Sequence, residues 1–278
     1  MTRRVLVINT DPQLGRAIGE ALAAKSCSFE LAAGDADALR RLRRTSFDAL
    51  VTSPLTNIEE DLALVEEVRD TRPGVKVIIL APQSSPEDVI AALRARVFVC
   101  FSAPFDAGEI SESAYRAATA EDWQGDIEVI SAHKEWVSLR VNCRLLTAER
   151  LVQFLGELRS EMPDVAHQEL MFAFHEIIMN SMEHGAGFDP EHVVEVAAVR
   201  TSRATVFYVR DPGEGFRRDA IPHAAVSNPA GEPTAHMQLR AEQGIRPGGY
   251  GILLARSLVD ELIFSEIGNE VLLIKHTA

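Results

Sequence analysis

The chain has 278 residues, of which 46% are hydrophobic and 25% charged, a composition typical of globular proteins long enough for two domains. Its net charge of −13 argues against nucleic acid or an anionic membrane as the main partner. Only four apolar residues follow Met1-Thr-Arg-Arg4, too few for a signal peptide, and no run is long enough to cross a membrane, so we expect a cytoplasmic protein.

Three cysteines are widely separated in the chain: Cys27, Cys100 and Cys143. They form no CxxC pair, and an odd number of scattered cysteines is not typical of a disulfide framework or a zinc site. We therefore expect three buried thiols in a reducing compartment.

The first 120 residues alternate short apolar runs with amphipathic stretches. The apolar runs are Val5–Ile8, Ser28–Leu31, Ala49–Thr52, Val75–Leu80 and Val97–Phe101. The helix-patterned stretches are 12–24, 35–44, 59–70, 86–95 and 107–119. Continuous apolar strands that alternate with helices indicate a parallel sheet covered on both faces. We expect a doubly wound α/β domain, with any site at the carboxyl ends of its strands.

This frame resembles a response-regulator receiver domain, which has a flavodoxin-like fold. The segments that carry the resemblance are VLVINTDP (5–12), FDALVTSPL (47–55), VIILAP (77–82) and APF (103–105). The resemblance implies an acidic pair for Mg²⁺, a phosphoacceptor aspartate, a Ser or Thr, and a lysine. The residues at the matching positions are instead Asn9 and Thr10, Ser53, Ala81 and Ala103. Only Asp11 remains, beside the pair, so aspartyl-phosphate chemistry is not available.

We therefore interpret this domain as a degenerate receiver that binds a partner or dimerises. Phosphorylation of Ser53 by another enzyme is an alternative that the sequence leaves open. The lysine–proline bond of receivers is usually cis, so we predict a cis peptide at Ala103–Pro104.

A polar, glycine-containing segment, TAEDWQGD (119–126), predicts a boundary between two domains. We expect the degenerate receiver domain to cover 1–120 and a second domain to cover 126–278.

The second domain is predicted to be an α/β sandwich. The expected strands are 127–130, 136–141, 193–201, 204–210, 262–267 and 270–275. The last two are expected to be joined by a two-residue turn, Gly268-Asn269. The expected helices are 146–158, 166–184 and 251–260, and His184-Gly185 is expected to cap the second. Residues 216–248 hold four prolines and few periodic apolar residues, typical of a mobile loop over a site.

Chemistry-bearing residues first gather in the helix at 166–184. Glu176, Asn180 and His184 are four residues apart, which places them on one helix face. The carboxamide oxygen of Asn180 is a suitable Mg²⁺ ligand, and Glu176 is placed to take a proton from an attacking hydroxyl. Asp211 ends a strand, where a buried carboxylate can accept a hydrogen bond from the adenine amino group.

Two glycine clusters follow. Gly213 and Gly215 allow the chain to pass close to a base and ribose. Three more glycines open the last helix: Gly248, Gly249 and Gly251. The first N–H groups of that helix favour phosphate, and Arg246 is close enough in sequence to reach a γ-phosphate. Each cluster alone is an ordinary turn, but their order and spacing predict a site for ATP and Mg²⁺.

These motifs resemble the GHKL ATPase superfamily, with HEIIMNSMEHG (175–185) as N box and DPGEGF (211–216) and GGYG (248–251) as glycine boxes. Over roughly 126–278, the form of the N box and the segments WVSLRV and ERLVQFLGEL resemble the anti-sigma factor serine kinases. The resemblance implies an ATP- and Mg²⁺-dependent kinase that phosphorylates Ser or Thr on an antagonist of the STAS fold, with Glu176 as base and Asn180 on Mg²⁺. It implies that antagonist, a sigma factor and a second copy of the chain as partners.

One departure from that family leaves an alternative open. The family usually carries an arginine where Pro247 stands, so either Arg246 substitutes for it or γ-phosphate handling is impaired. The alternative is an ATP-dependent binding switch, in which nucleotide orders 216–248 without phosphoryl transfer. A mechanical ATPase of the same superfamily is a third, less favoured interpretation.

Overall fold

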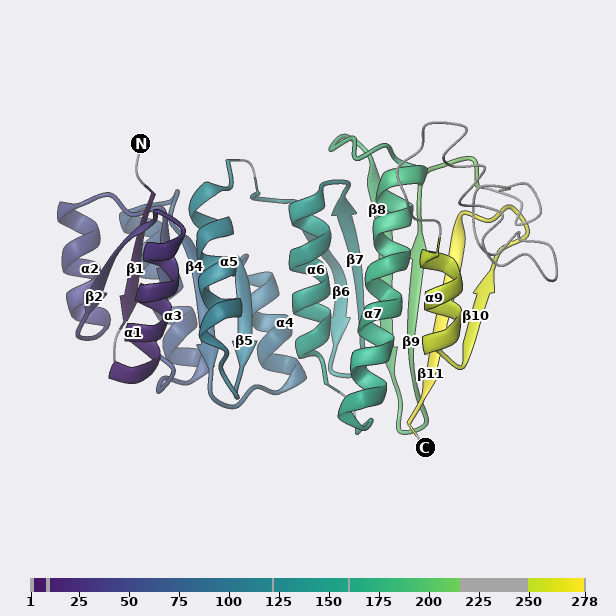
Figure 1. Cartoon of the computed structure of the whole chain (residues 1–278), viewed down its shortest axis with the longest axis horizontal. Coiled ribbons are helices and arrows are strands. Elements are labelled where there is room, and N and C mark those ends of the chain that lie inside the picture. The colour runs from purple at the N-terminus through teal and green to yellow at the C-terminus, as the bar shows by residue number, and fades with distance from the viewer. Residues whose placement is uncertain (1–2, 9–10, 122, 160, 216–249, 278) are drawn as a thin grey trace. The chain divides into compact units, whose positions relative to one another are not determined.

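The computed structural model describes residues 3–8, 11–121, 123–159, 161–215 and 250–277 (Figure 1). The chain contacts separate into two compact units, Met1–Gly125 and Asp126–Ala278. In the described parts of both units, no helix has the length and apolar character needed to cross a membrane. The three cysteines are free and buried, as predicted.

The first unit is a parallel five-stranded sheet with the strand order β2-β1-β3-β4-β5. Its strands are β1 (Arg4–Ile8), β2 (Ser28–Ala32), β3 (Ala49–Val51), β4 (Lys76–Ala81) and β5 (Val99–Ser102). Its helices are α1 (Pro12–Ala24), α2 (Asp35–Arg44), α3 (Ile58–Thr71), α4 (Pro86–Arg94) and α5 (Ala107–Thr119). This is the flavodoxin-like order of a doubly wound sheet, so the predicted receiver fold is confirmed.

Local sequence explains why these helices begin where they do. Asn57 and Ser85 form capping boxes at α3 and α4, each with an acidic residue three positions later. Asp11 caps α1, because its Oδ1 accepts hydrogen bonds from the backbone N–H groups of Gln13 and Leu14 at 3.0 and 3.2 Å. Asp11, beside the positions of the receiver's acidic pair, therefore acts as a helix cap.

The position of the receiver phosphoacceptor is closed to solvent. Ser53 is only 1% exposed, and its Oγ accepts a hydrogen bond from the N–H of Leu55 at 3.1 Å. This burial argues against phosphorylation of Ser53 by another enzyme. Asn9 and Thr10 lie outside the described residues, and the predicted cis peptide at Ala103–Pro104 is present.

The second unit is an antiparallel six-stranded sheet with the order β10-β11-β9-β8-β7-β6. Its strands are β6 (Ile127–His133), β7 (Trp136–Asn142), β8 (Val193–Arg200), β9 (Ala204–Arg210), β10 (Glu261–Phe264) and β11 (Glu270–His276). Its helices are α6 (Leu145–Glu157), α7 (Asp164–Asn180), the π-helical turn η1 (Ser181–Gly185) and α9 (Gly251–Leu258). Figure 1 shows α6, α7 and α9 on one face of the sheet.

The core of this unit lies between α7 and the sheet. Alternate residues of β7, β8 and β9 are buried, as the period of a half-buried strand requires. The ring of Phe174 in α7 packs on that of Phe207 in β9 with centroids 4.6 Å apart. Burial of each such side chain stabilises the fold by roughly 1.5–3 kcal/mol, so the core fixes where the polar face of α7 points.

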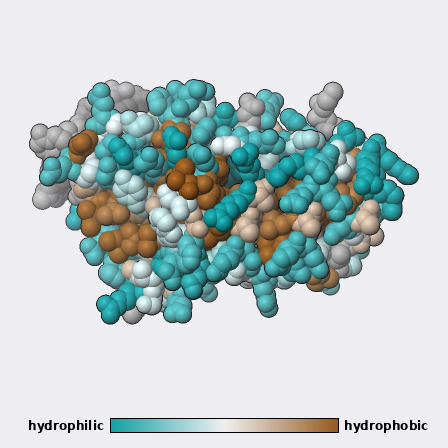
Figure 2. Space-filling model, turned by 180° about the vertical axis from the view of Figure 1, so that it is seen from behind, coloured by the Kyte–Doolittle hydropathy of each residue, from teal (hydrophilic) through white to brown (hydrophobic). Residues whose placement is uncertain are grey.

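The other face of the sheet carries apolar side chains across four strands. Register places Trp136, Val199, Val206 and Ile274 in one row. Figure 2 shows apolar side chains gathered over this sheet. A charged row lies two rows further along the same face, where the guanidinium of Arg210 is 3.7 Å from Oε2 of Glu195 and 3.6 Å from Oε1 of Glu270.

Two details of the second unit differ from the sequence expectation. The helix does not end in a cap at His184-Gly185. It widens into η1, and the left-handed residues that follow are Gly187 and Phe188, with φ of 63° and 54°.

The predicted Gly268-Asn269 turn is also wrong. β10 ends at Phe264, and a hydrogen bond from the N–H of Ser265 to the carbonyl of Glu270 closes a longer loop. This loop contacts the segment after β9 through a hydrogen bond from the N–H of Asp211 to the carbonyl of Asn269. The residues of a turn do not predict such a contact with a distant segment.

Candidate functional site

The polar face of α7 meets the first residue of α9. A Cβ atom added to Gly251 would lie 2.6 Å from Oε2 of Glu176 and 3.3 Å from Nδ2 of Asn180. A glycine lets α9 begin this close to both side chains, whereas a larger residue would displace the Glu176 carboxylate. Glu176 and Asn180 therefore share one side of a helix with the start of another, as their spacing predicted.

Glu176 is partly exposed and lies beside an imidazole. Its side chain is 34% exposed, and Nδ1 of His175 lies 3.8 Å from its Oε1. A carboxylate that is partly accessible and held on a rigid helix can exchange a proton with a bound group. His184 is exposed within η1, and no contact with Glu176 is found for it among the described residues.

Asp211 occupies a second close approach, between Gly185 and Gly213. A Cβ added to Gly185 would lie 2.4 Å from Cγ of Asp211, and one added to Gly213 would lie 2.9 Å from its Oδ1. The same Oδ1 accepts a hydrogen bond from the N–H of Gly213 at 2.9 Å. Burial raises the pKa of Asp211, and this hydrogen bond opposes the effect. The absence of a side chain at Gly185 therefore allows the close approach of Asp211 and does not serve a helix cap.

The loop after β10 supports the first glycine cluster from the other side. The N–H of Asp211 donates to the carbonyl of Asn269 at 3.0 Å, and Nδ2 of Asn269 lies 3.4 Å from the carbonyl of Gly213. Gly215 has a φ of 77°, and a Cβ there would lie 2.3 Å from the carbonyl oxygen of Ile267. The sequence indicated Asn269 only as part of a turn and did not predict that it supports the site.

Part of the predicted site lies outside the described residues. This holds for Arg246, Gly248 and Gly249 and for the expected loop at 216–248. The structure thus brings together Glu176, Asn180 and Gly251, and separately Asp211, Gly213 and Gly215 with Gly185.

The described residues contain no group of three or more His, Cys, Asp or Glu side chains able to hold a metal ion. A single carboxamide such as Asn180 suits Mg²⁺, which usually keeps water and phosphate ligands and takes only one or two from protein. Cys143 lies near this region, and burial together with the charges of Asp211 and Asp189 raises the pKa of its thiol to about 11. It is therefore an unreactive thiol and not a ligand.

Comparison with known families decides the class of the second unit. The family model for the histidine kinase-like ATPase domain matches residues 113–275. The chain belongs to this family. The matched residues include both groups described above, the one around Gly251 and the one around Asp211.

Part of the chain is similar to two curated transcriptional regulatory proteins. The chain is 28% identical over 126 residues to the transcriptional regulatory proteins GlrR of Escherichia coli K12 and QseF of E. coli O157:H7. The match covers 43% of this chain but only 28% of theirs, so the chain spans less than a third of the length of these curated relatives.

Solved receiver structures show the same partial likeness. A receiver domain protein from Methanospirillum hungatei is 20% identical with a TM-score of 0.38, covering 42% of this chain and 93% of its own. A response regulator from Thermotoga maritima is 21% identical with a TM-score of 0.39, covering 43% and 100%. The family match assigns the second unit, and the strand order described above gives the first unit its receiver-like fold.

Proposed function

We propose that this protein is an ATP-binding signalling regulator that acts as a protein serine/threonine kinase of the anti-sigma factor type. Its substrate would be an antagonist of the STAS fold. The observation that carries the proposal is the contact of Gly251 with both Glu176 and Asn180, because it joins a potential base, a potential Mg²⁺ ligand and a helix start.

The residues present fit ATP and Mg²⁺. Four glycines stand where a Cβ would collide with site atoms: Gly185, Gly213, Gly215 and Gly251. Such glycines let the surrounding segments pack closely against the side chains of the site. Asp211 would accept a hydrogen bond from the adenine amino group, and Asn180 would hold Mg²⁺ through its carboxamide oxygen. Bound ATP and Mg²⁺ would supply the phosphoryl group and neutralise charge on it.

Glu176 would orient the partner's hydroxyl and take its proton. A positioned carboxylate in this role typically accelerates a reaction by 10²–10⁴-fold. The start of α9 would present N–H donors to phosphate oxygens, where charge grows during transfer.

Transfer of labelled γ-phosphate from ATP to candidate STAS proteins tests the proposal. We expect Glu176→Gln to bind ATP with unchanged affinity and to lose transfer by at least 10²-fold. Asn180→Ala should lose both binding of Mg²⁺–ATP and transfer. Glu191→Gln, at an exposed carboxylate before β8, makes the same change of charge as a control and should keep both.

The ATP-dependent binding switch gives a different result in the same assay. It predicts that ATP is bound and that a STAS or sigma partner is retained in an ATP-dependent manner, with no label transferred by the wild-type protein. Pro247, at the place of the usual arginine, favours this alternative. Absence of ATP binding by calorimetry would contradict both functions.

We propose further that two copies pair through the outer face of the second unit's sheet. Its apolar row, in which Trp136 and Val199 are exposed, supports this proposal. Val206→Glu should convert a dimer to a monomer in sedimentation experiments, and a wild-type protein that sediments as a monomer would refute it.

A further inference from the structure

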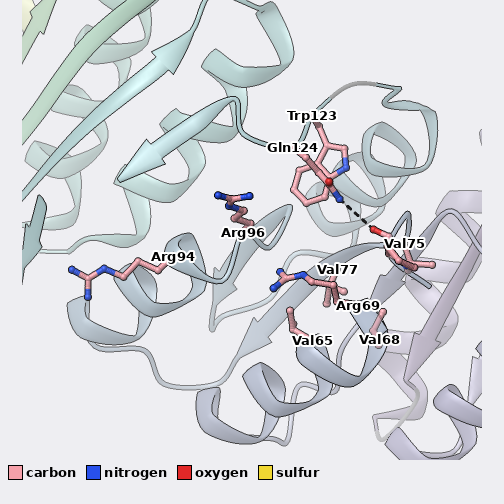
Figure 3. A pocket seen from close by; sticks show the side chains of 10 residues that line it. Val65, Val68, Arg69, Val75, Val77, Arg94, Arg96, Trp123 and Gln124 are labelled. Carbon is pink, nitrogen blue, oxygen red and sulfur yellow. Dashed lines mark hydrogen bonds between the residues drawn. The ribbon is translucent and has the colours of Figure 1, made fainter. Parts of the chain in front are cut away.

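A pocket of about 250 Å³ lies within the first unit, away from the position of the receiver phosphoacceptor. Its floor is formed by buried Val65, Val68, Val75, Val77 and Trp123. Three arginines also line it, Arg69, Arg94 and Arg96, and their side chains are drawn in Figure 3. These residues come from the ends of α3 and α4 and the start of β4, the opposite end of the sheet from Ser53.

The charges around this pocket are of one sign. Of the described residues that line it, none carries a carboxylate. The guanidinium of Arg69 donates one hydrogen bond to the carbonyl of Ala95, which leaves its other donors available. Arg94 has interactions of its own and points away from the other two in Figure 3. Arg69 and Arg96 are therefore the two guanidinium groups considered as anion ligands.

Arg96 has a backbone conformation that favours glycine. It follows α4 with φ of 53°, and its N–H donates to the carbonyl of Leu93 at 3.0 Å. Glycine usually occupies such a position, because a side chain in the left-handed region strains the backbone. Among the described residues, the guanidinium of Arg96 makes no hydrogen bond or ion pair that would repay this strain. Arg96 therefore brings to the pocket lining a guanidinium for which the described residues provide no hydrogen-bond or ion-pair partner.

The pocket also has a flat apolar wall. Trp123 packs edge-on against Phe98, with ring centroids 5.7 Å apart, and Nε2 of Gln124 holds the segment by donating to the carbonyl of Pro73 at 3.2 Å. An apolar cavity of about 150 Å³ is large enough for benzene, so this pocket has room for one ring and an anionic group. A guanidinium pairs well with a carboxylate or a phosphate.

We propose that this pocket binds a small organic anion, whose aromatic ring contacts Trp123 and the valines and whose carboxylate or phosphate is held by Arg96 and Arg69. Such a site would give the first unit an input that needs no phosphoacceptor aspartate. The existence of this site does not depend on whether the second unit binds ATP.

Nuclear magnetic resonance of the full chain tests the site directly. The chain has two tryptophans, Trp123 in the pocket and Trp136 in β7, so each indole N–H gives its own signal, and Trp136→Phe assigns them. We expect benzoate to shift the Trp123 signal saturably and to leave Trp136 unchanged. Acetate lacks the ring and benzyl alcohol lacks the charge, so each should bind at least tenfold more weakly. Phenyl phosphate distinguishes the two anionic groups by its affinity relative to benzoate.

Arg96→Gly is the decisive variant. Glycine suits the backbone at this position, so the variant should fold at least as stably as the wild type while its affinity for benzoate or phenyl phosphate falls at least tenfold. Arg43→Gln, an exposed arginine of α2, makes the same change in net charge and should bind normally. Unchanged affinity in Arg96→Gly, equal affinity for benzyl alcohol, or no saturable shift with either aromatic anion would overturn the proposal.

Discussion

The α-carbon of Gly185 lies directly against the carboxylate of Asp211, although the two residues are 26 positions apart in the chain. A methyl group at Gly185 would stand 2.4 Å from both Cγ and Oδ1 of Asp211. The widened turn η1 places Gly185 there, and π-helical turns of this kind often occur at functional sites.

Gly185→Ala is therefore expected to displace Asp211. The free energy of unfolding should fall by about 1–3 kcal/mol from overpacking, and ATP affinity should fall at least tenfold. Gly156→Ala is the matched control, because a Cβ there meets its nearest atom, Cε of Met171, at 3.8 Å. It should be neutral or stabilise the protein by about 0.5–1 kcal/mol. Urea unfolding and calorimetry with ATP measure both effects, and equal behaviour of the two variants would contradict this account.

Asp211→Asn tests the proposed contact with adenine. The variant keeps an oxygen that can accept from the N–H of Gly213 but loses the charge. A hydrogen bond to a charged group contributes about 1.5–3 kcal/mol, so ATP affinity should fall roughly 10–100-fold while GTP affinity changes little. Asp189→Asn, at a half-exposed carboxylate nearby, should leave the ratio of ATP to GTP affinity intact. A preserved ratio in Asp211→Asn would exclude adenine recognition by this residue.

Asp61 makes the stability of the first unit depend on pH. The residue is 1% exposed, Thr56 donates to its Oδ1 at 2.8 Å, and its Oδ2 has no hydrogen-bond partner. Burial, partly opposed by the hydroxyls of Thr56 and Thr52, raises the pKa of Asp61 to about 7 from 3.8. The folded state therefore holds a proton that the unfolded chain releases, and stability falls as pH rises from about 4 to about 7.

Asp61→Asn removes this dependence. It should raise the free energy of unfolding by on the order of 2–4 kcal/mol at pH 8 and change it little at pH 4. Urea unfolding of both proteins between pH 4 and 8 provides the measurement. Parallel pH profiles would show that Asp61 ionises normally in the folded state.

Lys275 ties three elements of the second unit together. From β11, its Nζ lies 2.7 Å from Oε2 of Glu169 in α7 and 2.9 Å from the carbonyl of Leu258 at the end of α9. Its side chain is only 14% exposed, so Lys275→Met should leave two polar groups unpaired and lower the free energy of unfolding by about 1–3 kcal/mol.

An exposed ion pair of the same length serves as the control. Arg159 lies 2.7 Å from Asp164, and both side chains are more than half exposed. Arg159→Met should change the free energy of unfolding by less than about 1 kcal/mol. If the two methionine variants lose the same stability, burial does not decide the strength of the Lys275 contacts.

Most secondary structure followed from local patterns in the chain. Apolar runs such as Val5–Ile8 and caps such as Asn57 act over a few residues, so the parallel sheet and its helices were predictable. The spacing of Glu176 and Asn180 likewise follows from the helix period alone. These features depend on neighbours in sequence, which the sequence displays directly.

Tertiary structure decided which distant segments contact one another around the site. Gly185 looked like a helix cap, and Gly268-Asn269 looked like a tight turn, because only local geometry could be read for them. In the folded protein, the first accommodates Asp211, and Asn269 supports the segment that follows β9. The pocket beside Trp123 also joins residues from α3, α4, β4 and the chain after α5. Packing sets such approaches between distant segments, and no periodicity in the chain records them.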